Sequence, residues 1–170
     1  MRRVFRTGLS LFLFFIMAAG DFASVTKVNF RVLSMRDGLS NDSVRALYQD
    51  HRGFIWIGTL YGLNRYDGYQ FKYYFQDPYR HSIEGNNIFA LAGDDEDRLW
   101  IGTWGNGLNV FVPHRNLFAC LKSEKLDLTT ISDNRVVSLF CDSRGFLWAG
   151  TDNGLNRLDM KTREFTRFFP

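Results

Sequence analysis

Internal repetition constrains the fold of this chain more strongly than any other feature of the sequence. Three segments share one pattern, and they begin at Ser43, Asn87 and Arg135. In each segment a tryptophan is followed two residues later by Gly-Thr, and then by Gly-Leu-Asn. A period of roughly 40–50 residues is typical of proteins built from stacked repeats. The residues expected to hold the same structural position in every repeat are Trp56, Gly58, Trp100, Gly102, Trp148 and Gly150.

Each repeat divides into four short strands. In the first repeat, apolar and polar residues alternate over residues 44–49, and further strands are expected over residues 54–59, 63–66 and 70–74. Glycines such as Gly53 provide the turns between them. Four strands in roughly 40–50 residues are typical of a β-propeller blade. The sequence therefore predicts an all-β fold, a partial β-propeller with one four-stranded antiparallel blade for each of the three repeats.

The region before the first repeat contributes one more predicted strand. Residues 28–34 alternate in polarity and precede the turn residues Asp37 and Gly38, as an outer strand that leads into the next blade would. The sequence accordingly divides into a signal peptide over residues 1–20, a lead-in with the outer strand over 21–42, and blade repeats over 43–86, 87–134 and 135–170.

The N-terminus is typical of an exported protein. Arg2, Arg3 and Arg6 precede an apolar stretch over residues 9–19, and small residues lie before Asp21. Basic, apolar and small-residue segments in this order form a secretory signal. We therefore expect an N-terminal signal helix, export to the periplasm and a mature terminus near Asp21. The apolar stretch is short for a membrane span, and an uncleaved anchor and a buried helix are the alternatives.

Charge and cysteine content limit the partners and cofactors. The net charge of +3 comes from the arginines of the signal segment, since 18 basic and 18 acidic residues balance over the rest of the chain. No nucleic-acid binding is therefore expected. We interpret Cys120 and Cys141 as two small buried hydrophobic residues, with a disulfide as the alternative in an exported chain. Two cysteines and three scattered histidines are too few ligands for a metal site, and neither a metal nor a cofactor is expected.

The first repeat, NDSVRALYQDHRGFIWIGTLYGLNRYDG, closely resembles the two-component regulator propeller repeat. The resemblance recurs in all three repeats and covers residues 28–169. The second repeat departs from the pattern at residues 94–97, where Asp-Asp-Glu-Asp replaces a glycine turn, and at Val110, where the other repeats have arginine. We interpret the acidic run as a solvated turn rather than a calcium site, because calcium needs oxygen ligands wrapped around the ion.

The resemblance implies the N-terminal, periplasmic sensor part of a hybrid two-component histidine kinase that is anchored in the inner membrane. Members of that family typically carry two seven-bladed propellers outside the membrane, and many respond to oligosaccharides. The implied partners are the remaining propeller blades of the parent sensor and an oligosaccharide, and a homodimer of the parent is left open. Three blades without a kinase resemble the N-terminal fragment of such a sensor.

The sequence contains none of the common catalytic motifs, and no catalytic residue is expected. An enzyme acting on polysaccharide would need paired carboxylates or a histidine-based site in a cleft, whereas the acidic residues here fall in turns or at repeat-equivalent places. Two alternatives remain beside the sensor. One is an exported propeller enzyme acting on polysaccharide, and the other is a truncated product with no independent activity.

A ligand is expected on the face where the second-to-third turns meet the connections between blades. An antiparallel chain reverses at every turn, so these turns and connections share one face. The connections are long, over residues 76–86 and 121–133, and the turns vary between repeats, as binding loops do. An aromatic platform beside amides and a carboxylate suits a sugar. The candidate ligand-binding residues are Tyr61, Trp104, Asn106, Asp152 and Asn153, with ordinary exposed turn residues as the alternative interpretation.

Overall fold

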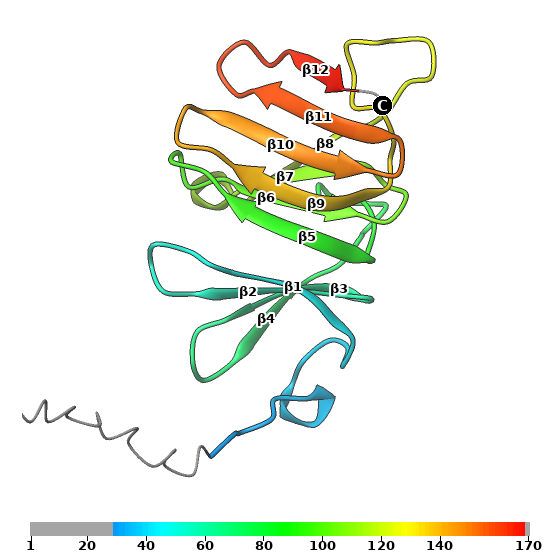
Figure 1. Cartoon of the computed structure of the whole chain (residues 1–170). Helices are drawn as coiled ribbons and strands as arrows, with labels where there is room; N and C mark the ends of the chain where they lie inside the picture. Colours follow the sequence, from blue (N-terminus) through cyan, green and yellow to red (C-terminus); the bar gives the residue numbers. More distant parts are fainter. Residues whose placement is uncertain (1–28, 169–170) are drawn as a thin grey trace, which may run out of the picture. The chain divides into compact units, whose positions relative to one another are not determined.

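The computed structural model describes residues 29–168 and contains three four-stranded antiparallel sheets (Figure 1). The chain divides into two units, residues 1–32 and residues 33–170, and the sheets belong to the second unit. The predicted signal peptide and its cleavage point lie outside the described residues. In the part that the structure describes, no helix is long and apolar enough to cross a membrane.

Each repeat forms one sheet, in which every strand pairs with the next strand along the chain. The prediction of four-stranded blades is therefore confirmed. Blade 1 consists of β1 (Val44–Gln49), β2 (Ile55–Thr59), β3 (Gly62–Tyr66) and β4 (Phe71–Tyr74). Blade 2 consists of β5 (Ile88–Gly93), β6 (Leu99–Thr103), β7 (Leu108–Val112) and β8 (Leu117–Leu121). Blade 3 consists of β9 (Val136–Cys141), β10 (Phe146–Thr151), β11 (Gly154–Asp159) and β12 (Phe165–Phe168).

The lead-in differs from the sequence prediction of an outer strand over residues 28–34. The structure assigns no strand to residues 29–34, and the 3-10 helix η1 (Met35–Asp37) follows. An extended segment becomes a strand only when a neighbouring strand accepts its backbone hydrogen bonds, and no described strand pairs with this segment. Alternating polarity predicts an extended conformation here but not its partner.

An aspartate closes the first hairpin of each blade and holds the tryptophan of the second strand. In blade 1, Asp50 Oδ1 accepts hydrogen bonds from the backbone N–H groups of Arg52 and Phe54, both at 3.0 Å. Its Oδ2 accepts a hydrogen bond from Trp56 Nε1, also at 3.0 Å. One carboxylate therefore fixes both the backbone of the turn and the orientation of the indole ring.

The same bonds recur in the other two blades. Asp94 accepts hydrogen bonds from two turn N–H groups and from Trp100 Nε1 at 2.7 Å. Asp142 does so with Trp148 Nε1 at 3.0 Å. The acidic run of the second repeat thus contains Asp94, the carboxylate that holds the turn and the tryptophan of its blade. In the same run Asp97 adopts a left-handed φ of +61°, at the position where the other blades have glycine.

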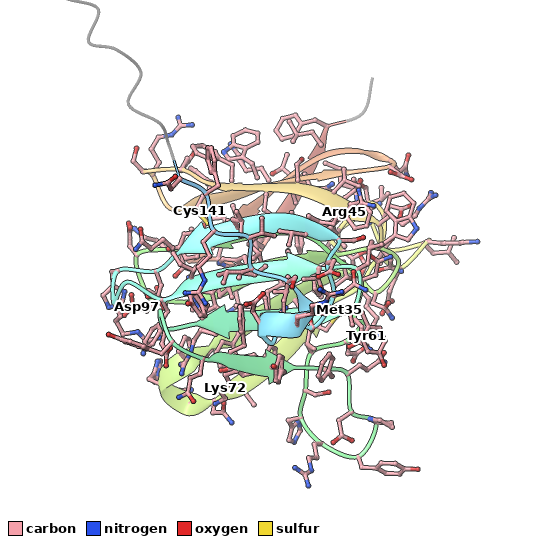
Figure 2. All side chains as sticks on the ribbon, turned by 90° about the horizontal axis from the view of Figure 1, so that it is seen from below. Met35, Arg45, Tyr61, Lys72, Asp97 and Cys141 are labelled. Carbon is pink, nitrogen blue, oxygen red and sulfur yellow. The ribbon has the colours of Figure 1, made fainter. Side chains whose placement is uncertain are left out.

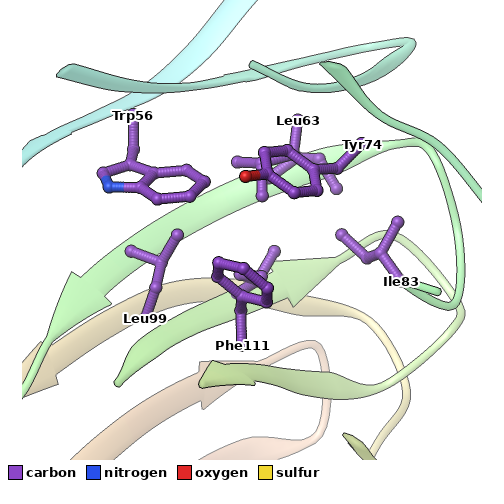
Figure 3. Close-up of a cluster of buried hydrophobic side chains, with 8 residues drawn as sticks. Trp56, Leu63, Tyr74, Ile83, Leu99 and Phe111 are labelled. Atoms are coloured by element: carbon purple, nitrogen blue, oxygen red, sulfur yellow. The ribbon is translucent and has the colours of Figure 1, made fainter. Parts of the chain in front are cut away.

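The core lies between blades rather than within one sheet. Trp56, Leu63 and Tyr74 of blade 1 point at Leu99 and Phe111 of blade 2 (Figure 3). The indole of Trp56 is 1% exposed and meets the Phe111 ring edge-on at 5.6 Å. The next interface repeats this arrangement, with Trp100, Leu108, Ile131, Val136, Leu147, Ala149 and Leu158 buried between blades 2 and 3. Burial of this apolar area is the main stabilising contribution.

The glycines two residues after Trp56 and Trp100 let neighbouring blades approach closely. A Cβ at Gly102 would lie 2.8 Å from the backbone oxygen of Val136 in blade 3. A Cβ at Gly150 would meet only the hydroxyl of Ser138 in its own blade, which is the exposed end of a side chain that can rotate. The two positions are equivalent in the repeat, but only Gly102 meets backbone.

Gly102→Ala is expected to destabilise the protein by about 1–3 kcal/mol, because overpacking against backbone forces the blades apart. Gly150→Ala is the matched control and is expected to cost clearly less, since Ser138 can move away. Urea denaturation of both variants measures the difference. Equal losses would contradict close backbone approach as the reason for glycine at position 102.

The turn carboxylates make stability depend on pH in the acid range. The hydrogen bond from Trp148, together with those from the turn N–H groups, lowers the pKa of Asp142 to about 2 from its ordinary 3.8. Burial raises the pKa of Asp50, but hydrogen bonds from Trp56 and Phe54 outweigh it, and the pKa of Asp50 is lowered as well. At a pH between about 2 and 3.8, Asp142 is therefore mostly protonated in the unfolded chain and mostly ionised in the folded chain.

The unfolding free energy is therefore expected to decrease as the pH falls from about 4 to about 2. The contribution of Asp142 is fully present above the unfolded pKa and is lost as the pH falls through the folded pKa. Asp142→Asn is expected to reduce this dependence, and Asp95→Asn, which removes an exposed carboxylate, is the control. Urea denaturation at several pH values is the measurement. A slope unchanged in Asp142→Asn would contradict the assignment.

Candidate ligand-binding face

The candidate residues lie where the second-to-third turn of each blade meets the connection that enters the blade. Trp104 N–H donates to the backbone oxygen of Asn87 at 2.9 Å, and Asp152 N–H donates to that of Arg135 at 3.3 Å. In blade 1 the equivalent bond joins Leu60 to Ser43 at 3.1 Å. We call this region the connection face: the turns over residues 60–61, 104–107 and 152–153 and the blade-to-blade connections over residues 75–87 and 122–135.

The connection face lies at one end of the strands. Figure 2 shows Arg45 and Tyr61 at this end, and Asp97 and Cys141 at the opposite end. The first-to-second turns, including Asp97, therefore lie away from the candidate residues.

Trp104 belongs to a stack of side chains that crosses the connection face. Its ring is 42% exposed and lies on the Phe89 ring, with 5.0 Å between centroids and 27° between planes. The guanidinium of Arg45 lies over the Phe89 ring, 5.4 Å from its centroid. The guanidinium of Arg135 lies over Trp104, at 5.8 Å. We call these residues, Arg45, Phe89, Trp104 and Arg135, the aromatic–arginine stack.

The two ends of the stack differ in charge. Arg135 makes an ion pair with Asp152 at 2.9 Å and another with Asp133 at 3.3 Å. Its hydrogen bond to Asp133 and the nearby Asp152 raise the pKa of Arg135 above its ordinary value. Arg45 is exposed, and no ion pair with a described carboxylate involves it. The charge of Arg135 is thus balanced by neighbours, whereas that of Arg45 is not.

A β-bulge places one side chain of each blade at this end. In β1, Val44 pairs with Thr59 and Ala46 with Gly58, so Arg45 is the extra residue. The same shift makes Phe89 the extra residue of β5 and Val137 that of β9. A bulge redirects the side chain of its extra residue. The bulges leave Arg45 and Phe89 without a cross-strand partner, and each is more exposed than the residue that follows it.

Tyr61 belongs to a separate aromatic cluster. Its ring, 58% exposed, lies 5.5 Å from that of Phe75, which lies 6.0 Å from that of Tyr73. Within residues 29–168, no ring contact joins this cluster to Trp104. The structure thus brings Trp104 and Asp152 together through Arg135, while Tyr61 stands apart on the same face.

The two predicted asparagines have different surroundings. The Asn106 backbone oxygen accepts a hydrogen bond from Cys120 Sγ at 3.1 Å, and its side chain lies against Gly85. Asn153 is exposed and donates a hydrogen bond to the backbone oxygen of Ser132 at 3.4 Å. Asn153 therefore has an exposed side chain next to Asp152, whereas the side chain of Asn106 is turned toward the connection.

The asparagine of each Gly-Leu-Asn motif is buried and holds the connection from inside. Asn156 Oδ1 accepts from Ser132 N–H at 2.9 Å, and Nδ2 donates to Ser132 Oγ at 2.8 Å. Asn64 binds Ser40 in the same way, and Asn109 binds the backbone of Glu84. All three asparagines are 0% exposed. These residues fix the connections and are not available to a ligand.

Both thiols are poor nucleophiles in this structure. Cys120 and Cys141 are free and half-buried. Burial raises the thiol pKa to about 11 for Cys120 and to about 12 for Cys141. At neutral pH both thiols are protonated, and a nucleophilic cysteine needs the thiolate.

Sequence reasoning missed three members of the aromatic–arginine stack. Arg45 and Phe89 lie 11 residues before the tryptophans of their repeats, so the repeat alignment carried a signal that they are equivalent. Arg135 directly precedes β9, and the sequence pattern marks it only as the first residue of its repeat. The contacts among them run between blades, and the pattern within one repeat contains no sign of such contacts.

A family model described as "Two component regulator propeller" matches residues 38–61, 82–105 and 130–153. Each match begins in the connection held by a buried asparagine and ends in a second-to-third turn. The chain therefore carries three segments that match this repeat.

A curated relative, "Histidine kinase P4" of Formosa agariphila, is 35% identical over 106 residues. The match covers 60% of this chain and 8% of the kinase, so the chain spans a small part of that relative's length.

Solved structures show the same architecture. The extracellular domain of a putative hybrid two component system from B. thetaiotaomicron is 30% identical, with a TM-score of 0.76 over 82% of this chain and 20% of that one. The extracellular domain of a putative one component system from the same organism is 23% identical, with a TM-score of 0.61 over 77% and 19%. A virginiamycin B lyase from Staphylococcus aureus, 11% identical with a TM-score of 0.57 over 78% and 43%, shares the fold alone.

Asn156→Ala is expected to lower the unfolding free energy by about 1–3 kcal/mol, because it leaves the buried Ser132 N–H without an acceptor. Asn153→Ala, three residues earlier and exposed, is the control and is expected to stay within about 0.5 kcal/mol of wild type. Chemical denaturation of the two variants is the measurement. A similar small effect for both would contradict the structural role of Asn156.

Proposed function

We propose that this chain is part of the extracytoplasmic ligand-sensing propeller of a two-component sensor, and that the ligand is an oligosaccharide bound at the connection face. The observation that carries the proposal is the aromatic–arginine stack. It joins residues from all three blades on the face of the long connections, and it is bordered by carboxylates and an exposed amide.

The chemistry of the stack supports a sugar ligand. A pyranose ring has an apolar face that packs on an exposed aromatic ring, and its hydroxyls need donors and acceptors beside that ring. Trp104 is such a ring, and Asp152 and Asn153 lie at its Arg135 end. The rigid blades beneath hold these groups in place without any ligand.

The comparisons support the setting of a sensor. The repeat family is that of two-component regulators, one relative is a histidine kinase, and one similar structure is an extracellular domain of a putative hybrid two component system. We infer that the basic and apolar N-terminus exports the chain to the periplasm, and that the parent protein is anchored in the inner membrane. In this role the chain binds its ligand without transforming it.

The exposed face of blade 3 supports a partnership with further blades. Trp148 occupies the position of the buried Trp56 and Trp100, yet it is only half-buried, and it stacks on Phe168 at 5.8 Å. Phe140 on the same sheet is 64% exposed. We infer that another propeller blade of the parent sensor covers this face, as blades 2 and 3 cover their neighbours.

Trp104→Ala is expected to weaken oligosaccharide binding about tenfold through loss of ring stacking. Tyr61→Ala tests the second aromatic cluster in the same way. Tyr69→Ala removes an exposed tyrosine from the third-to-fourth turn at the opposite end of blade 1, and is expected to leave binding unchanged. Isothermal titration calorimetry with a panel of oligosaccharides is the measurement. Affinity unchanged in Trp104→Ala, with the fold intact by circular dichroism, would remove Trp104 from the site.

A further inference from the structure

The unbalanced charge of Arg45 restricts the kind of sugar that suits the connection face. Several arginines of the described chain pair with a carboxylate, as Arg52 does with Asp50 and Arg144 with Asp142. Arg45 instead lies over the Phe89 ring. Within residues 29–168, no carboxylate forms an ion pair with the hydrogen-bonding edge of its guanidinium. A planar guanidinium held against a ring is well placed to bind a carboxylate or sulfate through two parallel hydrogen bonds.

The backbone favours a role for Arg45 beyond packing. Arg45 is the extra residue of the β1 bulge and lies at the same end of the strands as Tyr61 (Figure 2), and Phe89 and Val137 are the extra residues of the equivalent bulges in β5 and β9. Only blade 1 places a charge at this position. Because bulges occur often beside binding sites, where they redirect a side chain, the position is suited to contact a ligand.

We propose that the aromatic–arginine stack binds an acidic oligosaccharide, with an anionic group of the sugar paired with Arg45 and a pyranose ring packed on Trp104. This inference rests on the proposed function and specifies the ligand class. The anionic group is a carboxylate, as in a uronic acid, or a sulfate ester, since both match the guanidinium edge.

The stack also gives the bound sugar a direction. At the opposite end Arg135 is already paired with Asp133 and Asp152, so that end repels a second anion and offers carboxylate oxygens to hydroxyl groups. Three successive steps of 5.4, 5.0 and 5.8 Å separate the two guanidinium groups. A run of that length suits a short oligosaccharide whose acidic group lies at the Arg45 end.

The test is calorimetric titration of the full chain with matched pairs of trisaccharides. The acidic probes are α-1,4-trigalacturonate, β-1,4-trimannuronate and a 6-sulfated galactotriose, and each is paired with its carboxyl-reduced or desulfated counterpart. We expect at least one acidic member to bind about tenfold more tightly than its uncharged counterpart. This preference is expected to weaken with added salt. The uronate and sulfate arms distinguish the two sources of anionic charge.

Variants connect the preference to Arg45. Arg45→Ala is expected to reduce the affinity for the acidic probe about tenfold while leaving its uncharged counterpart unchanged, and Arg45→Lys is expected to retain part of the preference. Arg115→Ala, which removes an exposed arginine from the third-to-fourth turn at the other end of blade 2, is the control and keeps the preference.

Two results would overturn the inference and are distinguishable. Equal affinity for charged and uncharged members, with no effect of Arg45→Ala, contradicts the acidic ligand but leaves the oligosaccharide sensor standing. No binding of any trisaccharide by the folded chain contradicts the inference and the proposed function together.

Discussion

The packing of one sheet face on the next is the interaction on which the rest of this structure depends. A four-stranded sheet of this kind has two apolar faces and cannot bury both by itself. Trp56 and Trp100 are buried only because blades 2 and 3 lie against them, and the equivalent Trp148 is half-buried at the face that no described blade covers. The stability of each blade is therefore inseparable from that of its neighbour.

Two polar devices align the sheets for this packing. At one end of the strands a turn aspartate holds the indole that enters the interface, and at the other end a buried asparagine holds the connection that arrives from the preceding blade. The aspartate and the asparagine supply hydrogen-bond partners to the indole N–H and to the backbone of the connection, so these polar groups remain hydrogen-bonded when they are buried. Because the asparagine fixes the connection from inside, the exposed turn residues can vary without loss of the fold. This separation explains how Leu60, Trp104 and Asp152 occupy one structural position with different chemistry.

The sequence predicted the blades well because each strand pattern is local. Alternation, glycine turns and the repeated tryptophan placed β1 at its observed bounds and the other strands of blade 1 within one residue. The predicted outer strand was not formed by residues 29–34, because a strand depends on a partner that alternation cannot supply. The site was predicted less completely. Trp104 and Asp152 were identified from variation between repeats, whereas Arg45, Phe89 and Arg135 acquire their contacts only when separate blades pack together.

The bulges connect the packing to the site. In a regular strand, side chains alternate between the two faces that neighbouring blades cover. The residues flanking Phe89, Ile88 and Ala90, are buried in that way. In β1 and β5 one extra residue has no cross-strand partner and joins the aromatic–arginine stack at the connection face. The glycine that pairs with the next residue, Gly58 or Gly102, keeps the blades close. A ligand held by Arg45 and Trp104 would touch side chains from different blades of one packed core. Its binding free energy would therefore also stabilise the association of those blades, because it binds only the packed state.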